Sequence, residues 1–387
     1  MALSLICIAD LAARELQELV ASLGEPGYRA KQLQRWVYRR LAVSFDEMTD
    51  LPQGFRQGLA AGARVHGITA VHEVTGSDST IKTLFALADG KTIEAALMRY
   101  PGAGGRARHT VCVSTQVGCP IGCPFCATGQ QGFERNLSAG EIVDQVLYFA
   151  RRLRDQSDGG AVRADGTTGH ISNIVFMGMG EPLANYEALR RAMEALNSPE
   201  GFGLAARSMT ISTAGLVPQI QLLSKENLQV GLTVSLHASN NALRDRLVPV
   251  NRGYPLEELI PACRQYGELT GRRISFEYVL LDGVNDSLVQ ARALAHLVAG
   301  LNCHVNLIRA NPGASQAFRP SPEQAVLAFQ GELTRLRINS TLRQPRGQGI
   351  DAGCGQLRSR FRAGAGNVSV AVKTAGVARE GEKPKRL

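Results

Sequence analysis

Four of the eight cysteines lie within one short stretch, "CVSTQVGCPIGCPFC", which runs from Cys112 to Cys126. Cys119, Cys123 and Cys126 have the spacing C-x3-C-x2-C and follow directly on "TVCVST", a segment with the composition of a strand. Three thiolates on one loop can each bind one iron of a [4Fe-4S] cluster, which leaves the fourth iron without a protein ligand. This spacing therefore predicts a [4Fe-4S] cluster with one iron open to a further ligand.

Structural zinc and inert core cysteines are the alternatives to a cluster. Structural zinc has four ligands, usually in two separated pairs, and no second Cys or His pair follows nearby at that spacing. Core cysteines are scattered, as expected for Cys7, Cys263 and Cys303, which lie in apolar stretches. The cluster is the interpretation that three closely spaced cysteines after a strand favour.

The composition is that of a soluble globular protein. The chain has 387 residues, of which 44% are hydrophobic and 20% charged. No apolar run approaches the roughly 20 residues needed to cross a bilayer, so we expect no membrane association. The start, "MALSLICIADLAARELQELV", lacks the order of a secretion signal, which predicts a cytoplasmic protein. In that compartment a cysteine cluster more often binds metal or performs redox chemistry than forms structural disulfides.

Residues 1–100 are predicted to form a small α+β accessory domain that binds RNA. In "YRAKQLQRWVYRRLAVSF" four apolar residues, including Trp36, share one helical stripe, which places Trp36 in a core. The basic residues lie largely elsewhere on that helix and form either a solvated face or a nucleic-acid contact. "TIKTLFALADGKTIEAALM" predicts a β-hairpin that turns at Asp89-Gly90, because both residue types tolerate positive φ.

Residues 101–357 are predicted to form the core domain. Six strand candidates alternate with helical patterns, and they are "TVCVST", "SNIVFMG", "SMTIST", "VGLTVSL", "RISFEYVLL" and "CHVNLI". The first long helix opens with Ser138 and Glu141 at capping-box spacing. Such alternation predicts an α/β fold with a parallel sheet, because parallel neighbours require crossover connections. Six repeats are too few for an eightfold barrel, so we expect a partial (βα)6 barrel with its site at the C-terminal strand ends.

Residues 358–387 are predicted to be a disordered basic tail. The net charge of the chain is +9, and this segment carries eight basic residues against two acidic ones, or +6 of the total. A mobile basic segment could follow a phosphate backbone. The alternative is a solubilising tail without a partner.

Several motifs, taken together, resemble a known family. "CPIGCPFC" at the end of the first strand of a βα series resembles the radical S-adenosylmethionine enzymes. "CATGQQGFERNL", "FMGMGEPLANY", "ISTAGLVPQI", "SLHASNNALRDRLVPVN", "FEYVLLDGVND" and "GIDAGCGQL" then resemble the ribosomal and transfer RNA adenine-C2 methyltransferases. "FDEMTDLP" extends the likeness, which covers about residues 28–357. The resemblance implies a [4Fe-4S] cluster, S-adenosylmethionine, and 23S rRNA and tRNA as substrates.

The resemblance also implies how an unreactive carbon is methylated. Carbon 2 of adenine lies between two ring nitrogens and is electron-poor, so it cannot attack an electrophilic methyl group. In the family a cysteine carries the methyl, and Cys354 matches it. Two S-adenosylmethionine molecules are used per turnover, one to methylate Cys354 and one to generate the radical that activates this methyl. Cys112 matches the cysteine that releases the product while forming a disulfide with Cys354, and Glu94 matches the proton acceptor.

The remaining site residues also come from the resemblance. Gly180, Glu181, Ser212, Ser235, Leu236, His237 and Asn311 match the family's contacts to S-adenosylmethionine. Without the resemblance, Gly180 would predict only a tight turn, because Leu183 breaks the dinucleotide-binding pattern. His237 would predict a structural histidine, and Glu94 a solvated residue on a hairpin strand.

Two departures from the family pattern bear on substrate choice. Arg309-Ala310 replaces the usual Pro-Trp before Asn311, and Gly353 replaces the usual alanine before Cys354. "NLIR" resembles the relatives that methylate carbon 8 of the same adenosine and confer antibiotic resistance, whereas "QQGFERNL" and the N-terminal match favour carbon 2. The other alternative is a non-catalytic iron–sulfur RNA-binding protein. We further expect a monomer that takes electrons from a donor such as flavodoxin or ferredoxin.

Overall fold

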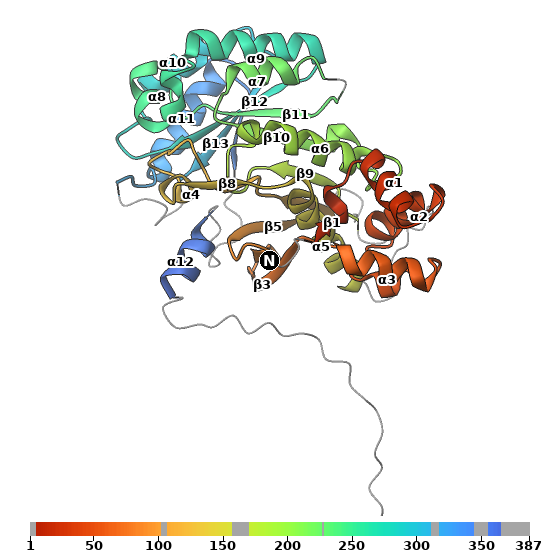
Figure 1. Ribbon diagram of the computed structural model, residues 1–387. Coiled ribbons are helices and arrows are strands. Elements are labelled where there is room, and N and C mark those ends of the chain that lie inside the picture. The colour runs from red at the N-terminus through yellow and green to blue at the C-terminus, as the bar shows by residue number, and fades with distance from the viewer. Residues whose placement is uncertain are drawn as a thin grey trace, which may run out of the picture.

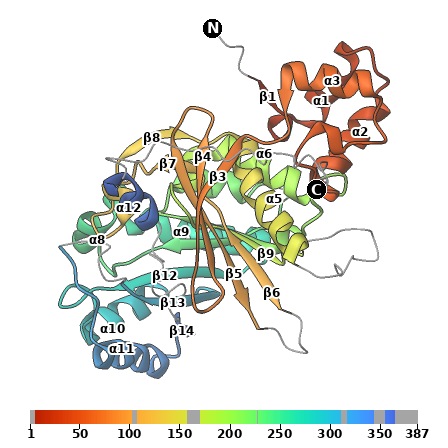
Figure 2. The same ribbon diagram turned by 90° about the horizontal axis from the view of Figure 1, so that it is seen from below.

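The computed structural model describes residues 5–101, 107–156, 170–226, 228–310, 317–343 and 355–364. Its main feature is a ten-stranded sheet with the order β14-β13-β12-β11-β10-β9-β6-β5-β4-β3 (Figures 1 and 2). The strands are β3 (Ile68–Thr75), β4 (Ile81–Leu87), β5 (Thr92–Tyr100), β6 (Arg108–Cys112), β9 (Asn173–Phe176), β10 (Met209–Thr213), β11 (Gly231–Ser235), β12 (Ile274–Leu280), β13 (Cys303–Arg309) and β14 (Ser340–Arg343). Neighbours from β6 to β14 are parallel, which confirms the predicted α/β barrel architecture.

The six predicted strands correspond to β6 and β9 to β13, and β14 was not predicted. This strand has only four residues, "STLR", with a half-polar composition. Among the residues that the structure describes, it pairs with β13 only, in parallel, so it forms the edge of this sheet. A short edge strand has little of the apolar run by which sequence analysis recognises a buried strand.

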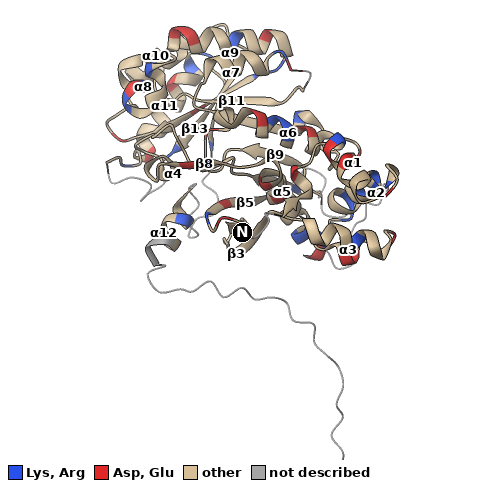
Figure 3. Ribbon diagram, in the orientation of Figure 1, with Lys and Arg blue, Asp and Glu red and all other residues tan. Residues whose placement is uncertain are grey.

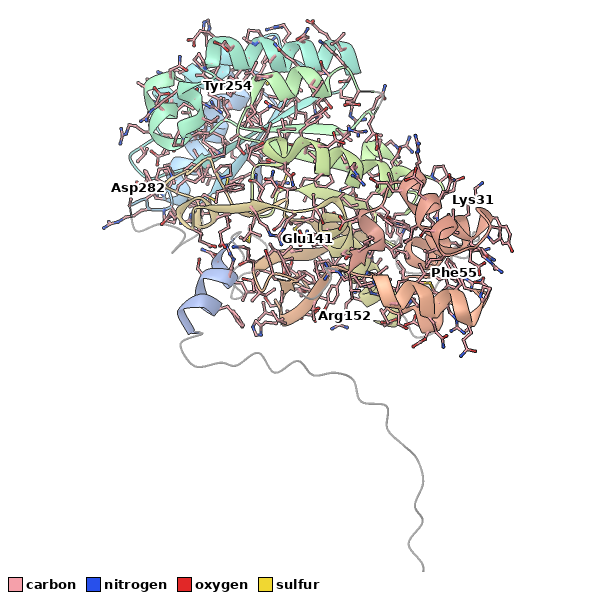
Figure 4. The ribbon with its side chains drawn as sticks, in the orientation of Figure 1. Lys31, Phe55, Glu141, Arg152, Tyr254 and Asp282 are labelled. Atoms are coloured by element: carbon pink, nitrogen blue, oxygen red, sulfur yellow. The ribbon has the colours of Figure 1, made fainter. Side chains whose placement is uncertain are left out.

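The helices between the parallel strands are α5 (Ala139–Gln156), α6 (Tyr186–Asn197), α7 (Val217–Leu223), α8 (Asn241–Leu247), α9 (Leu256–Thr270), α10 (Leu288–Leu297) and α11 (Glu323–Arg335). Helices α6, α7, α9 and α10 lie together on one side of the sheet (Figure 1). The predicted capping box of α5 is confirmed, because Glu141 N donates to Ser138 Oγ at 3.1 Å and Ser138 N donates to Glu141 Oε2 at 3.0 Å. Glu141 lies near the middle of the molecule in Figure 4.

The two faces of the parallel sheet differ in chemistry. Alternate residues of the strands are apolar and fully buried in the core, among them Val111, Ile174, Ile211, Val234 and Phe276. The residues between them point to the opposite face, because successive side chains of a strand alternate. That opposite face carries polar side chains, and it is where the predicted site residues lie.

The N-terminal unit is built from α1 (Ala13–Ser22), α2 (Tyr28–Gln34), a π-helical turn (Arg35–Arg39) and α3 (Gln53–Gly62). Strand β1 (Ile6–Cys7) pairs in parallel with β2 (Ala63–Arg64), which closes the unit. The prediction that Trp36 lies in the core is confirmed, and Phe55 of α3 is buried as well. Cys7, Cys263 and Cys303 are likewise buried, as predicted. Short 3-10 turns complete the chain at Ile8–Asp10, Phe45–Glu47, Pro182–Asn185, Ala206–Ser208 and Pro249–Arg252.

The hairpin at Asp89-Gly90 is confirmed, and β4 and β5 pair antiparallel on either side of it. Gly90 has a φ of 76°, as the tight turn requires. The hairpin does not remain within the N-terminal unit, however. Strand β5 pairs with β6, so the sheet of the core domain continues across the boundary that we expected near residue 100. A hairpin has the same sequence pattern whether it closes its own domain or extends the sheet of another.

Helix α12 (Gln356–Gly364) corrects part of the prediction for the tail. A disordered segment from residue 358 was wrong for residues 358–364, because they form this helix, and the Arg358 side chain is fully buried. The sequence pattern suggested a solvated charge run because the acidic partner of Arg358, Glu134, is distant in sequence. Residues 365–387 lie outside the described residues. No helix among the described residues is both long and apolar enough to cross a bilayer.

Candidate active site

The cysteine loop is closed by a two-stranded ribbon at its base. Strand β7 (Gln116–Gly118) pairs antiparallel with β8 (Phe133–Asn136), and Cys119 N donates to Gly132 O at 2.9 Å. Gly118 has a φ of 78°, and a Cβ atom there would lie 1.8 Å from Gly132 O. Only glycine therefore permits this ribbon. Within the loop, α4 (Ala127–Gln130) begins directly after Cys126, so all three predicted cluster cysteines lie in one closed loop.

The three thiols are half-buried and interact electrostatically. Burial raises the pKa of Cys119 to about 12. Burial, followed by the charges of Cys126 and Cys119, raises the pKa of Cys123 well above its ordinary value. Thiolates in this loop would need nearby cations, which the irons of a cluster supply. The donor set thus fits an iron–sulfur cluster.

A mononuclear metal site has a different geometry. Sulfur ligands of one zinc ion lie about 2.3 Å from the metal, so they must converge closely on one point. Among the described residues no three Cys, His, Asp or Glu side chains converge in that way. Ligands of a cubane bind separate irons and lie farther apart. The C-x3-C-x2-C spacing of Cys119, Cys123 and Cys126 on one loop is the feature that fits a cluster.

The cysteine loop packs over the ends of the parallel strands. Ile121, Cys123 and Phe125 contact an apolar cluster that contains Ala238 and Val279, which lie at the C-terminal ends of β11 and β12. The Phe125 ring meets the His237 ring edge to face, with centroids 5.0 Å apart. This is the end of the sheet at which ligand sites of such folds occur.

His237 is held rigidly and in one protonation state. It has a φ of 58°, which is uncommon for a residue other than glycine, and its side chain is buried. Its Nδ1 accepts a hydrogen bond from Val279 N at 3.1 Å. Burial, and then the charge of Arg244, lowers the pKa of His237 to about 3. The ring is therefore neutral near pH 7, with its proton on Nε2.

Arg244 links several segments through hydrogen bonds from its buried guanidinium, and sequence analysis did not identify it. Its guanidinium is fully buried and donates to Ala214 O at 2.5 Å, Leu236 O at 3.2 Å and Asn251 Oδ1 at 2.8 Å. Burial lowers its pKa to about 10. The ends of β10 and β11 are thus joined through one side chain. The pattern "ALRDRL" predicts a charged residue on the exposed side of an amphipathic helix, so no local signal indicated that Arg244 is buried.

Glu181 joins the loop after β9 to the end of β10. Its carboxylate accepts hydrogen bonds from Ala214 N at 2.7 Å and Leu183 N at 3.0 Å, and burial raises its pKa to about 7. Gly180 has a φ of 109°, and a Cβ atom there would lie 2.7 Å from the Gln116 Cβ. The glycine therefore allows close backbone approach, beyond the tight turn that its sequence context predicts.

The serines predicted to bind the cofactor share one face of the sheet with Cys112. The strand register aligns Cys112 with Val175, Val175 with Thr210, and Ser212 with Thr233. Residues two apart on a strand point to the same side, so Cys112, Ser212 and Ser235 lie on the polar face. Leu236 follows β11 and is fully buried. Asn311 lies outside the described residues.

Glu94 lies on the same polar face and is buried, not solvated. The register pairs Ala96 of β5 with Cys112 of β6, so Glu94, two residues before Ala96, lies diagonally across from Cys112. The Glu94 carboxylate forms an ion pair with Lys82 at 2.7 Å and accepts a hydrogen bond from Gly355 N at 2.9 Å.

Gly355 directly follows Cys354, which itself lies outside the described residues. The fold thus brings Glu94, Cys112 and the chain neighbour of Cys354 together on one face. Sequence analysis did not identify Lys82. Alternation along β4 could have indicated it as an inward-pointing charge opposite Ala96.

Two family models match this chain. The model described as "Radical SAM superfamily" matches residues 113–295, which begin directly after Cys112. The model described as "Ribosomal RNA large subunit methyltransferase N-terminal domain" matches residues 6–65, the unit that the β1–β2 pair closes.

Similar proteins agree with these two models. A protein of Moorella thermoacetica named "Probable dual-specificity RNA methyltransferase RlmN" is 46% identical over 92% of this chain and 98% of its own length. A Syntrophobacter fumaroxidans protein named "Dual-specificity RNA methyltransferase RlmN" is 46% identical over 92% of this chain and 99% of its own. A crystal structure of a radical SAM methyltransferase from Sphaerobacter thermophilus is 50% identical, with a TM-score of 0.84, and covers 92% of this chain and 99% of its own. The chain therefore belongs to the dual-specificity RNA methyltransferase RlmN family of the radical SAM superfamily.

Proposed function

We propose that this enzyme methylates carbon 2 of an adenosine in the peptidyl transferase centre of 23S rRNA, and carbon 2 of the adenosine 3′ of the anticodon in tRNAs. The observation that carries the proposal is the convergence of Glu94, Cys112 and the chain neighbour of Cys354 on one face of the sheet. A direct methyl transfer from S-adenosylmethionine to the base would need neither cysteine. The family match over both the N-terminal unit and the barrel supports the same reaction.

The cofactors are a [4Fe-4S] cluster and S-adenosylmethionine. Cys119, Cys123 and Cys126 would hold the cluster. When bound, the cluster and one S-adenosylmethionine supply a 5′-deoxyadenosyl radical, and a second S-adenosylmethionine supplies the methyl group. The residues proposed to bind S-adenosylmethionine are Gly180, Glu181, Ser212, Ser235, Leu236, His237 and Asn311. The neutral His237 can offer an Nε2 proton there without adding positive charge near a sulfonium.

Three side chains then take part in the methylation of carbon 2. Cys354 holds the methyl and, after this methyl loses a hydrogen atom, delivers its carbon to the ring as a covalent protein–RNA adduct. Glu94 accepts the proton that leaves carbon 2, and the unpaired electron then left on the ring would return to the one-electron redox centre that supplied it. The Cys112 sulfur then attacks the Cys354 sulfur, so an S–S bond forms, the sulfur–carbon bond breaks, and the product methyl group acquires a proton. The diagonal placement of Cys112 and Glu94 is compatible with these consecutive roles.

The alternatives are not favoured. Methylation of carbon 8 would make the chain a resistance enzyme, but the relatives that match along 92% of this chain are named as RlmN. The family model of the N-terminal unit is likewise that of a ribosomal RNA methyltransferase. A non-catalytic iron–sulfur protein would have no use for a buried carboxylate that lies near Cys112 and contacts the chain neighbour of Cys354.

Product analysis after anaerobic reconstitution tests the proposed function. The protein, loaded with iron and sulfide, is mixed with S-adenosylmethionine, a reductant and either a 23S rRNA fragment or tRNA. The RNA is then digested to nucleosides, which are separated and identified by mass spectrometry. We expect 2-methyladenosine from both RNAs. Finding 8-methyladenosine, or no methylated adenosine with a fully loaded cluster, would contradict the proposal.

The partners and cellular setting belong to the same proposal. Reduction of the cluster requires a one-electron donor, for which a cytoplasmic flavodoxin or ferredoxin is suited. We propose that the enzyme works as a monomer, because both cysteines of the carrier chemistry come from one chain. Three exposed basic residues are proposed to contact RNA phosphates, namely Lys31 of α2, Arg35 of the π-helical turn and Arg40 directly after that turn. Basic residues of α2 lie at the outer edge of the N-terminal helices in Figure 3, as Lys31 does in Figure 4.

Deleting residues 366–387 is expected to weaken RNA binding and to flatten its dependence on salt. This segment carries five basic and two acidic residues, and phosphate contacts made by the basic residues release counterions. Affinity measured between about 50 and 200 mM salt checks the slope. Because the deletion leaves α12 intact, turnover at saturating RNA should be unchanged. A slope equal to that of the full chain would show that the segment only aids solubility.

A further inference from the structure

We infer that Arg358 is a positioning residue, which fastens the segment bearing Cys354 to strand β5 and to the chain that follows the third cysteine. The inference rests on the proposed function in one respect, namely that Cys354 carries the methyl. Arg358 lies in the first turn of α12, beside β5 and α4 (Figure 1). In the sequence it counted only as one charge of the predicted basic tail.

The side chain of Arg358 is fully buried and contacts two separate parts of the barrel. Its Nη2 forms an ion pair with Glu134 of β8 at 2.6 Å, and its Nη1 donates to Gln131 Oε1 at 2.9 Å. Its Nε donates to Thr92 Oγ1 of β5 at 3.3 Å. A buried guanidinium without such partners would be strongly unfavourable, so its position depends on them. The planar fork of arginine suits this spread of acceptors, which a lysine could not match.

Gln131 connects the same turn of α12 to the cysteine loop. Its Nε2 donates to Gly355 O at 2.8 Å and to Ser359 Oγ at 2.7 Å. Gln131 follows α4, and α4 begins directly after Cys126, the third predicted cluster ligand. A Cβ atom at Gly355 would lie 2.6 Å from Thr128 Oγ1, so α12 and α4 meet closely. The segment next to Cys354 is thus tied to the loop proposed to hold the cluster.

Glu94 binds the opposite side of the same helix turn. Its carboxylate accepts hydrogen bonds from the backbone N–H groups of Gly355 and Arg358, as a helix-capping carboxylate does. Residue 354 is therefore within one chain step, about 3.8 Å between Cα atoms, of a residue that contacts the proposed proton acceptor. Arg358 and Glu94 together set the position of the carrier relative to the base.

Helix α12 depends on its contacts with the barrel. It has nine residues, too few to be stable alone, and among its described side chains Leu357 is the buried apolar one. Phe361 adds a tilted ring contact to His72 at 6.4 Å. Loss of the Arg358 contacts should therefore release α12 while the rest of the barrel stays folded. This makes the effect of Arg358 local and measurable.

The test compares hydrogen exchange and thiol alkylation in the full-length, cluster-loaded protein. The variants are Arg358→Met, Arg358→Lys, Glu134→Gln, and the double variant Glu134→Gln/Arg358→Met. The control is Arg190→Met on α6, an arginine whose ion pairs, with Glu187 and Glu194, lie at the surface. In Arg358→Met we expect exchange of residues 355–364 and alkylation of Cys354 to accelerate by about tenfold or more, because local opening becomes easier. Iron content and exchange elsewhere should remain unchanged.

The other variants separate positioning from general stability. Arg358→Lys should restore part of the protection, and Glu134→Gln should give an intermediate acceleration. The double variant should resemble Arg358→Met alone, because both changes remove one network. The control should match the parent. Parent-like exchange and alkylation in Arg358→Met would overturn the inference, as would independent, additive effects of the Glu134 and Arg358 changes. If Arg358→Met unfolds globally, Glu134→Gln and Arg358→Lys decide by the same two readouts.

Turnover supplies a readout that a purely structural role would not move. With S-adenosylmethionine and RNA, Arg358→Met should lower kcat while the KM for RNA stays within about twofold, since binding is unaffected. It should also release more 5′-deoxyadenosine per methylated adenosine, because the carrier is displaced from the radical source. An unchanged ratio with unchanged kcat would overturn the inference. If wild-type Cys354 never acquires a methyl, the proposed function fails, whereas the exchange and alkylation results still decide the docking role.

Discussion

Cys112→Ala is expected to accumulate a covalent protein–RNA adduct, whereas Cys354→Ala should form no adduct and transfer no methyl. Cys112 lies at the end of β6, on the polar face that also carries Glu94. In the proposed reaction its sulfur acts only after the carrier carbon has joined the base. Without Cys112, loading of Cys354 and attack on RNA should proceed, and the reaction should then stop. A denaturing gel would show the adduct as a slow band, and nuclease digestion would leave a mass-shifted peptide containing Cys354.

The asymmetry between the two variants excludes simpler roles for the cysteines. In a structural disulfide either substitution would act through stability alone. In a direct polar methyl transfer neither thiol would be needed. Cys303→Ala is a suitable control, because Cys303 is a buried cysteine of β13 and should leave product formation intact. Normal methylation by Cys354→Ala would refute the carrier mechanism. Absence of an adduct with Cys112→Ala, despite a methylated Cys354, would remove Cys112 from its role.

The fold could be predicted from the sequence because its signals are local. Buried parallel strands have strong apolar runs, and their alternation with helices implies a parallel sheet, as observed from β6 to β13. The capping box at Ser138 and the turn at Asp89-Gly90 depend on near neighbours and were predicted correctly. The extension of the sheet by β3 to β5 was not predicted, since strand pairing across domains leaves no local pattern.

The candidate site was only partly predictable for the same reason. The cysteine spacing is local, so Cys119, Cys123 and Cys126 could be recognised as one group. Arg358 was missed because its partner, Glu134, is distant in sequence. Lys82 pairs with Glu94 on the neighbouring strand of the predicted hairpin, and alternation along β4 could have indicated it. Buried charges of this kind have the composition of solvent-exposed ones, and only the fold reveals their pairing.

Replacing Cys119, Cys123 and Cys126 together by alanine is expected to abolish iron and sulfide binding, and with it all methylation. The parent protein, purified without oxygen, should bind about four irons and four sulfides, because three thiolates can hold a cubane with one open iron. The ribbon of β7 and β8 closes the loop independently of the thiols, and Ile121 and Phe125 still pack on the strand ends. The triple variant should therefore remain folded, which circular dichroism and unchanged RNA affinity would verify.

Cys263→Ala, a change at a fully buried cysteine of α9, is the matched control and should keep its iron. The measurements are the iron and sulfide content and the visible absorbance of the reconstituted protein. Stoichiometric zinc bound through these three residues, with no iron–sulfur absorbance, would show that the loop is a structural metal site, and radical chemistry would then have no source in this chain.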